Sequence, residues 1–104
     1  MATFRTLELA KEFHKLVNNL SLTGHLRDQL YRAATSIPLN LAEGNSRPTA
    51  KDKKRFYRTA YASLKECQTI LELASIDDEV ITKKADHLGA SLYKLTKATN
   101  PPLQ

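Results

Sequence analysis

The sequence is poor in the residues from which disulfide scaffolds and phosphate-binding loops are built. It contains one cysteine, which excludes a disulfide within the chain and a metal framework made of cysteines. Its three glycines never cluster, so no glycine-rich loop can cradle a phosphate. No apolar run approaches the ~20 residues of a membrane span, and acidic residues stand where a signal peptide would be apolar. We therefore expect a soluble, cytoplasmic protein with no membrane partner.

The few histidines and the single thiol fit no catalytic or metal-binding motif. A di-iron carboxylate bundle needs a glutamate three positions before a histidine, and none of His14, His25 and His87 has one. Neither His-x-x-x-His nor His-Glu-x-x-His occurs, and no arginine precedes a histidine at the Arg-x4-6-His spacing of a helical RNase. Cys67 falls on an apolar helical stripe and is interpreted as a buried structural residue. The sequence predicts a protein that is not an enzyme and has no metal or other cofactor.

Apolar residues at helical spacing are abundant along the whole chain. They recur in alternating steps of four and three, which places each set on one face of a helix, and no hairpin signal interrupts them. We expect helices near residues 3–20, 24–43, 50–75 and 78–98. The corners between them are short and favour antiparallel neighbours. The predicted fold is therefore all-α: one antiparallel up-down-up-down four-helix bundle over residues 1–104.

Residues at the corners predict where the helices begin and end. Thr23 and Asp77 are predicted to cap the N-termini of the second and fourth helices. Thr49 and Asp52 have the form of a capping box at the start of the third helix, with Asp in place of the usual Glu. Gly44-Asn45 is predicted to adopt the left-handed conformation that closes the second helix.

Pro38 lies inside the second helix, where it removes a backbone donor and is predicted to kink the helix. Ser36 and Asn40 lie within one turn of it and can bond the polar groups that the proline frees. Glu43 is predicted either to pair with Arg47 or to cap the start of the third helix. All of these are structural interpretations, which we favour over a catalytic one.

The distribution of charge indicates a binding surface. Lysine and arginine outnumber aspartate and glutamate by 16 to 11, a net charge of +5 that favours polyanions. Projection of the third helix, with Phe56 marking the core, places a cationic stripe on its outer side, with Tyr57 and Tyr61 flanking it. The predicted polyanion contacts are Arg47, Lys51, Lys54, Arg55, Arg58 and Lys65. The tyrosines can stack on unpaired bases. The alternative is a solvated helix face without a ligand.

The crowding of cations at the start of the third helix also needs an explanation. Lys51, Lys53, Lys54 and Arg55 lie where the helix macrodipole is already positive, which costs ~0.3–1 kcal/mol for each cation at low salt. Asp52 offsets only part of this cost. A local rule broken without compensation points to function.

Two further sets of residues are assigned to contacts between helices or between subunits. Phe4, Leu7 and Leu39 project away from the core stripes and are predicted, with the tyrosines of the third helix, to form a homo-oligomer interface. Glu66 is predicted to form a structural ion pair with Arg27 or Arg32 across an antiparallel pair of helices.

The run LYRAATSIPLNLAEG, residues 30–44, resembles the signature of the bacterial four-helix-bundle proteins, also called 23S rRNA intervening-sequence proteins. Its core, Ser-Ile-Pro-x-Asn-x-Ala-Glu-Gly, is specific, and residues 47–56 and 62–66 are also similar to the family. Members of that family are similar to the accessory subunit of diversity-generating retroelements, a homopentameric ring that binds a reverse transcriptase and RNA. The resemblance implies a homopentamer, with RNA or a reverse transcriptase as partner.

These observations lead to one preferred function and one alternative. The preferred function is a non-catalytic, homo-oligomeric basic bundle that binds nucleic acid, in particular RNA, through the cationic face of its third helix. The alternative is a protein-interaction scaffold or an accessory subunit, for example of a reverse transcriptase, with no direct role in RNA binding.

Overall fold

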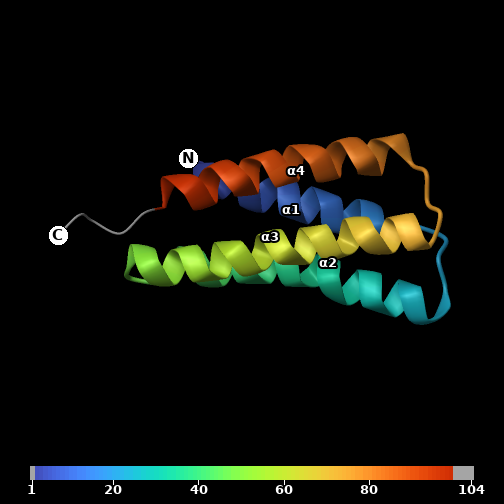
Figure 1. Cartoon of the computed structure of the whole chain (residues 1–104), viewed down its shortest axis with the longest axis horizontal. Coiled ribbons are helices and arrows are strands. Elements are labelled where there is room, and N and C mark those ends of the chain that lie inside the picture. The colour runs from blue at the N-terminus through green and yellow to red at the C-terminus, as the bar shows by residue number, and fades with distance from the viewer. Residues whose placement is uncertain (1, 100–104) are drawn as a thin grey trace.

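The computed structural model describes residues 2–99, which form four helices joined by short corners (Figure 1). Helix α1 spans Ala2–Asn18, α2 spans Gly24–Asn45, α3 spans Ala50–Leu73 and α4 spans Glu79–Ala98. No strand occurs in this part of the chain. The helices run alternately up and down, so the predicted all-α antiparallel bundle is confirmed. The observed ends differ from the predicted ends by about two residues at most.

Each helix packs against two others, so the four surround one apolar core. The neighbours are α1 with α2, α2 with α3, α3 with α4, and α4 with α1. The contact between α2 and α3 is the most extensive, and that between α3 and α4 is the least. Side chains from all four helices are fully buried in the core, among them Leu9, Phe13, Leu30, Ile37, Leu41, Leu64, Leu88 and Leu92. Each buried side chain of this size stabilises the fold by about 1.5–3 kcal/mol.

The second helix ends differently from the prediction. It continues through Gly44, which has no positive φ, and ends on Asn45 with Ser46 as a right-handed C-cap, so the left-handed closure was wrong. Gly44 is buried inside the last turn, against α3. At the other end, Thr23 occupies the N-cap position but makes no side-chain capping bond. Gly24, which follows it, has a φ of +77°.

Side-chain caps begin the third and fourth helices. Thr49 Oγ1 accepts a hydrogen bond from the backbone N of Asp52 at 3.2 Å, which is one of the two bonds of the predicted capping box. The cap of α4 is Asp78, whose Oδ1 accepts from the backbone N of Ile81 at 3.0 Å. The assignment of this cap to Asp77 was therefore wrong by one residue.

Helix α2 continues without a break through Pro38. Asn40 Nδ2 donates to the backbone oxygen of Ser36 at 2.8 Å and to its Oγ at 2.9 Å. The Ser36 hydroxyl in turn bonds the hydroxyl of Ser63 on α3 at 2.9 Å. The carbonyl that Pro38 frees is that of Ala34, and none of these bonds reaches it. Ser36 and Asn40 instead bond within α2 and link α2 to α3. The amplitude of a bend at Pro38 stays a prediction.

The predicted ion pair of Glu66 does not form. No salt bridge joins this exposed residue to Arg27 or Arg32 within residues 2–99. Arg27 Nη1 instead lies 3.4 Å from Asp28 Oδ1, and its Cζ lies 5.5 Å from the centroid of the Tyr31 ring. Partners within one turn of the same helix require less ordering of long side chains than a partner on another helix does.

Candidate nucleic-acid interface

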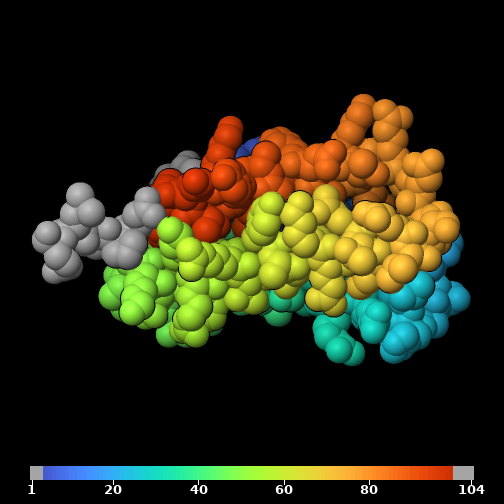
Figure 2. All heavy atoms as spheres, in the orientation of Figure 1, coloured from blue at the N-terminus to red at the C-terminus, as the bar shows by residue number. Residues whose placement is uncertain are grey.

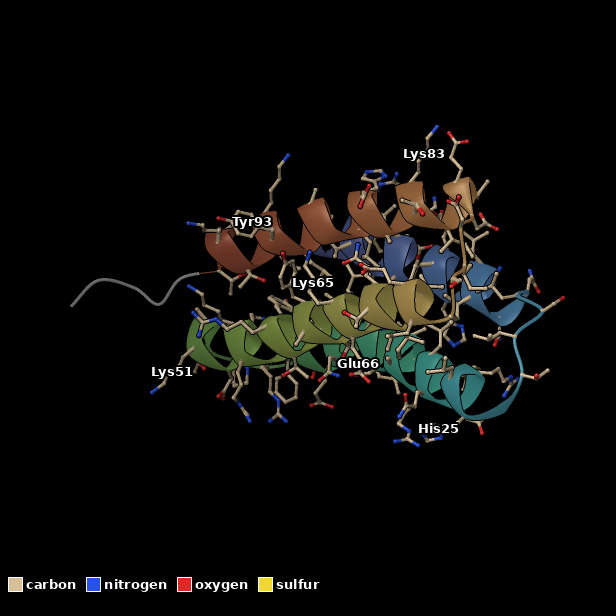
Figure 3. The ribbon with its side chains drawn as sticks, turned by 45° about the vertical axis from the view of Figure 1, so that its right-hand side comes forward. His25, Lys51, Lys65, Glu66, Lys83 and Tyr93 are labelled. Carbon is tan, nitrogen blue, oxygen red and sulfur yellow. The ribbon has the colours of Figure 1, made fainter. Side chains whose placement is uncertain are left out.

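The predicted cations of α3 gather at the end of the bundle where α2 turns into α3. One hollow in the surface, of about 570 Å³, is lined by Lys51, Asp52, Lys54, Arg55 and Arg58. Figure 3 shows Lys51 on the first turn of α3, at the opposite end of the bundle from His25. Four of the six predicted cations are thus brought together around a concave surface with a single carboxylate.

Two arginines lie over the ring of Phe56: Arg47, in the corner between α2 and α3, and Arg55, on α3. The Cζ of Arg47 lies 4.7 Å from the centroid of the Phe56 ring, and that of Arg55 lies 4.8 Å from it. Arg47 Nη2 also pairs with Glu43 Oε2 at 3.1 Å, which confirms one of the two roles predicted for Glu43. Arg55 Nη2 lies 4.0 Å from Asp52 Oδ1. Exposed cation–π contacts contribute about 0.5–1 kcal/mol, so both guanidinium groups are held in place.

Tyr57 is not part of this surface. Its ring is 1% exposed, and its hydroxyl donates to Asn45 Oδ1 at 2.6 Å. Burial raises the pKa of Tyr57 above its usual value. The prediction that Tyr57 contacts bases or another subunit was therefore wrong. The projection took Phe56 as the centre of the core face, whereas α3 turns the next residue towards α2 because Gly44 leaves space there.

Lys53 has a structural role that the sequence did not reveal. Its Nζ donates to the backbone oxygens of Asn45 at 3.0 Å and Gly44 at 3.4 Å, at the C-terminus of α2. The Gly44 carbonyl also accepts from the backbone N of Arg47 at 3.1 Å, so Lys53 adds to the bonding at this helix end and offsets the negative end of the helix dipole. For Lys53, therefore, the charge at the start of α3 is compensated by the end of α2.

Tyr61 and Lys65 face the seam between α3 and α4, the face viewed in Figure 2. Tyr61 is half-buried, and Lys65 Nζ lies 5.2 Å from the centroid of its ring. A hollow of about 280 Å³ along this seam is lined by Tyr61, Lys65, Gln68, Ala85, Asp86, Gly89, Ala90 and Tyr93. The apolar stripe of α4 gives no sign of Tyr93, because the meeting of Tyr61 and Tyr93 at one hollow depends on how the two helices pack.

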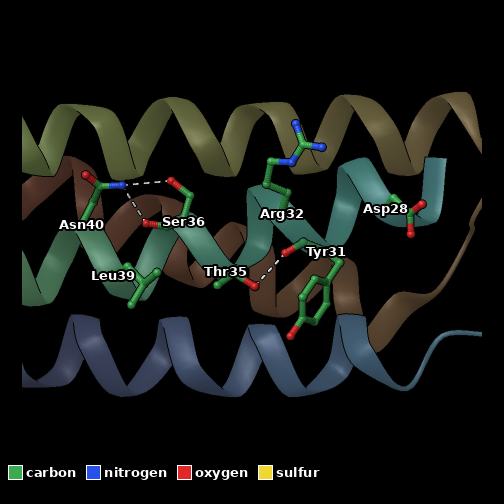
Figure 4. A pocket seen from close by; sticks show the side chains of 7 residues that line it. All are labelled: Asp28, Tyr31, Arg32, Thr35, Ser36, Leu39 and Asn40. Atoms are coloured by element: carbon green, nitrogen blue, oxygen red, sulfur yellow. Dashed lines mark hydrogen bonds between the residues drawn. The ribbon is translucent and has the colours of Figure 1, made fainter. Parts of the chain in front are cut away.

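The three residues predicted to form an oligomer interface differ in exposure. Phe4 and Leu39 are 63% and 64% exposed. Leu7 is partly buried and packs against the core, so its assignment to a free surface was wrong. Leu39 lines a mostly apolar hollow of about 520 Å³ on the outer face of α2. Figure 4 shows Leu39, Thr35 and Tyr31 on the side of α1, and Ser36, Asn40 and Arg32 on the side of α3.

Reactive groups are few in the described part of the chain. Cys67 is buried, as predicted, and burial together with the charge of Glu66 raises the pKa of its thiol to about 12. Such a thiol is not ionised at neutral pH and is a poor nucleophile. Within residues 2–99, no three His, Cys, Asp or Glu side chains lie close enough together to hold a metal ion. None of the described helices could cross a membrane.

The family model described as 23S rRNA-intervening sequence protein matches residues 3–100, nearly the whole chain. No curated protein matches the chain. The family match agrees with the resemblance carried by residues 30–44, whereas the link to the accessory subunit of diversity-generating retroelements stays a prediction.

Proposed function

The chain belongs to the family of 23S rRNA-intervening sequence proteins, and on that basis we propose that it is a non-catalytic RNA-binding protein. The phosphates of the RNA contact the cationic face of α3, which we define as Lys51, Lys54, Arg55, Arg58 and the adjoining Arg47. The observation that carries this proposal is the hollow in which four cations and one carboxylate surround the first turns of a helix.

Helix polarity and side-chain charge act together at this site. The cations lie on the first turns of a 24-residue helix, whose N-terminus carries the positive end of the helix dipole and unpaired backbone N–H groups. Anions are favoured at such a terminus, and arginine and lysine contacts to phosphate supply a large share of the affinity of nucleic-acid-binding proteins. Arg47 and Arg55 are held over the Phe56 ring, so less side-chain entropy is lost when they bind.

We further propose that copies of the chain associate through the exposed apolar residues Phe4 and Leu39. The hollow around Leu39 and the 41% exposed Tyr31 supports this proposal, because its lining is mostly apolar. In a closed homo-oligomer, such as the pentamer implied by the resemblance, symmetry repeats the cationic face and adds avidity for a long RNA. The same hollow supports the second candidate function, an accessory subunit that binds a protein such as a reverse transcriptase.

The proposal is tested by measuring RNA binding across a salt series. We would compare the wild type with K51Q/K54Q/R58Q, using an RNA hairpin with single-stranded flanks. The slope of log K against log salt is about 0.7 per phosphate for a single strand, so the triple variant should flatten it by about 2. The control K11Q/K15Q/K83Q removes the same charge from other helices and should keep most of the slope. Equal slopes for the two variants would overturn the proposal and leave the accessory-subunit function.

A further inference from the structure

The seam between α3 and α4 carries an aromatic hollow next to the cationic face. Tyr61 on α3 and Tyr93 on α4 line it from either side, and Tyr93 is 54% exposed. The small residues Ala85, Gly89 and Ala90 also line it. Figure 3 shows Tyr93 on the part of α4 nearest its C-terminus and Lys65 on α3, along the same seam. The hollow therefore combines aromatic surface with small neighbouring side chains.

The packing of the two helices leaves this space open. The contact of α3 with α4 is the least extensive of the four helix contacts in the bundle. A Cβ at Gly89 would meet only the Cδ2 of Leu64, at 3.4 Å. Few core side-chain atoms therefore lie near the seam at Gly89. A flat group can therefore approach the seam without displacing the core.

We propose that this hollow binds an unpaired base of the RNA whose phosphates contact the cationic face of α3, an inference that rests on the proposed function. Base–aromatic stacking is tolerant of sequence and changes affinity by about 5- to 150-fold per base. The amide of Gln68 and the carboxylate of Asp86 supply hydrogen-bonding groups at the same hollow for the edge of the base.

Charges around the hollow place the phosphate outside it and the base inside. Lys65 Nζ lies 5.2 Å from the Tyr61 centroid, and Lys97 Nζ lies 5.5 Å from the Tyr93 centroid. Asp86 lies in the lining itself and repels a phosphate but not a neutral base. Lys65 lines the hollow and lies about two helical turns along α3 from Arg58, a member of the cationic face.

Duplex RNA keeps its bases stacked and paired, so only a single strand can insert a base here. The test compares wild type and Y93A on a mixed-sequence single strand of about a dozen nucleotides and on its duplex. Tyr93 is chosen because it is exposed, whereas Tyr61 packs against the core. We expect Y93A to weaken single-strand binding by at least about 5-fold and to leave duplex binding unchanged. Y93F should bind like the wild type, because stacking needs the ring and not the hydroxyl.

The matched control is V80A, which removes another exposed apolar side chain of α4, outside the hollow. If Y93A and V80A have the same effect on the single strand, the base site is overturned. When K51Q/K54Q/R58Q still weakens binding in that case, the cationic face stands without the base site. If the triple variant also binds like the wild type, both proposals fail.

Discussion

The ring of Tyr57 occupies the space that a side chain at Gly44 would need. A Cβ built on Gly44 would lie 2.7 Å from Cε1 and 3.0 Å from Cδ1 of that ring. The absence of a side chain therefore lets the last turn of α2 lie directly against the first turns of α3. Two bonds reinforce this approach: the Tyr57 hydroxyl donates to Asn45, and Lys53 donates to the carbonyls that end α2.

Substitution of Gly44 by alanine should destabilise the bundle. The added methyl group overpacks the contact, which typically costs about 1–3 kcal/mol, although alanine is the better helix former. G89A is the matched control, because Gly89 also lies inside a helix but its Cβ would make only an ordinary contact, 3.4 Å from Leu64. We expect G89A to stabilise the protein by about 0.5–1 kcal/mol. Urea unfolding measures both changes, and equal effects would contradict the packing role of Gly44.

The buried hydroxyl of Tyr57 should make the protein sensitive to alkaline pH. Burial raises its pKa above the usual 10.0, so the folded state favours the neutral phenol. Its contribution to the free energy of unfolding is complete below pH 10.0 and declines as pH rises through the raised value. Y57F should unfold more easily at pH 8 by about 0.5–1.5 kcal/mol, since it lacks the bond to Asn45. Its unfolding free energy should then decline less steeply above pH 10 than that of the wild type.

Cys67 should react with thiol reagents only when the bundle opens. Its side chain is buried, and its pKa is raised from 9.0 to about 12. At pH 8 we expect labelling by a disulfide-exchange reagent to be slow in buffer and rapid in urea. Because the folded thiol resists ionisation, its contribution to stability is complete below pH 9.0 and is lost as pH rises towards 12. Rapid labelling of the folded protein would show that the thiol is accessible.

Two neighbouring lysines of α3 should separate stability from binding. Lys53 donates to the C-terminal carbonyls of α2, so K53Q should destabilise the fold by about 1 kcal/mol and change RNA affinity little. Lys51 is exposed at the positive end of the α3 dipole and lines the cationic hollow. K51Q should therefore leave stability unchanged or raise it by about 0.3–1 kcal/mol while it weakens RNA binding. Parallel losses of stability and binding in both variants would argue against this division of roles.

The apolar spacing predicted the four helices, because a repeat of three and four is a property of each helix alone. The helical projection of α3 also predicted the cations that gather around the hollow. What it missed depends on neighbouring helices. A glycine at position 44 can serve a left-handed turn or a close helix contact, and the residues around it suit either. The burial of Tyr57 and the shared hollow of Tyr61 and Tyr93 depend on how α3 packs against α2 and α4, which no spacing within one helix determines.

The uneven distribution of helix contacts has a consequence for motion. Helices α2 and α3 form the most extensive contact, with the serine hydroxyls, Lys53 and Tyr57 bridging them, whereas α3 and α4 share the least. Thermal fluctuations that open a protein locally begin where buried contacts are fewest. We therefore expect the bundle to open transiently along the α3–α4 seam while the α2–α3 hairpin stays closed. Backbone amides of α4 should exchange with deuterium sooner than those of α3, and the aromatic hollow can widen without disturbing the array of cations beside it.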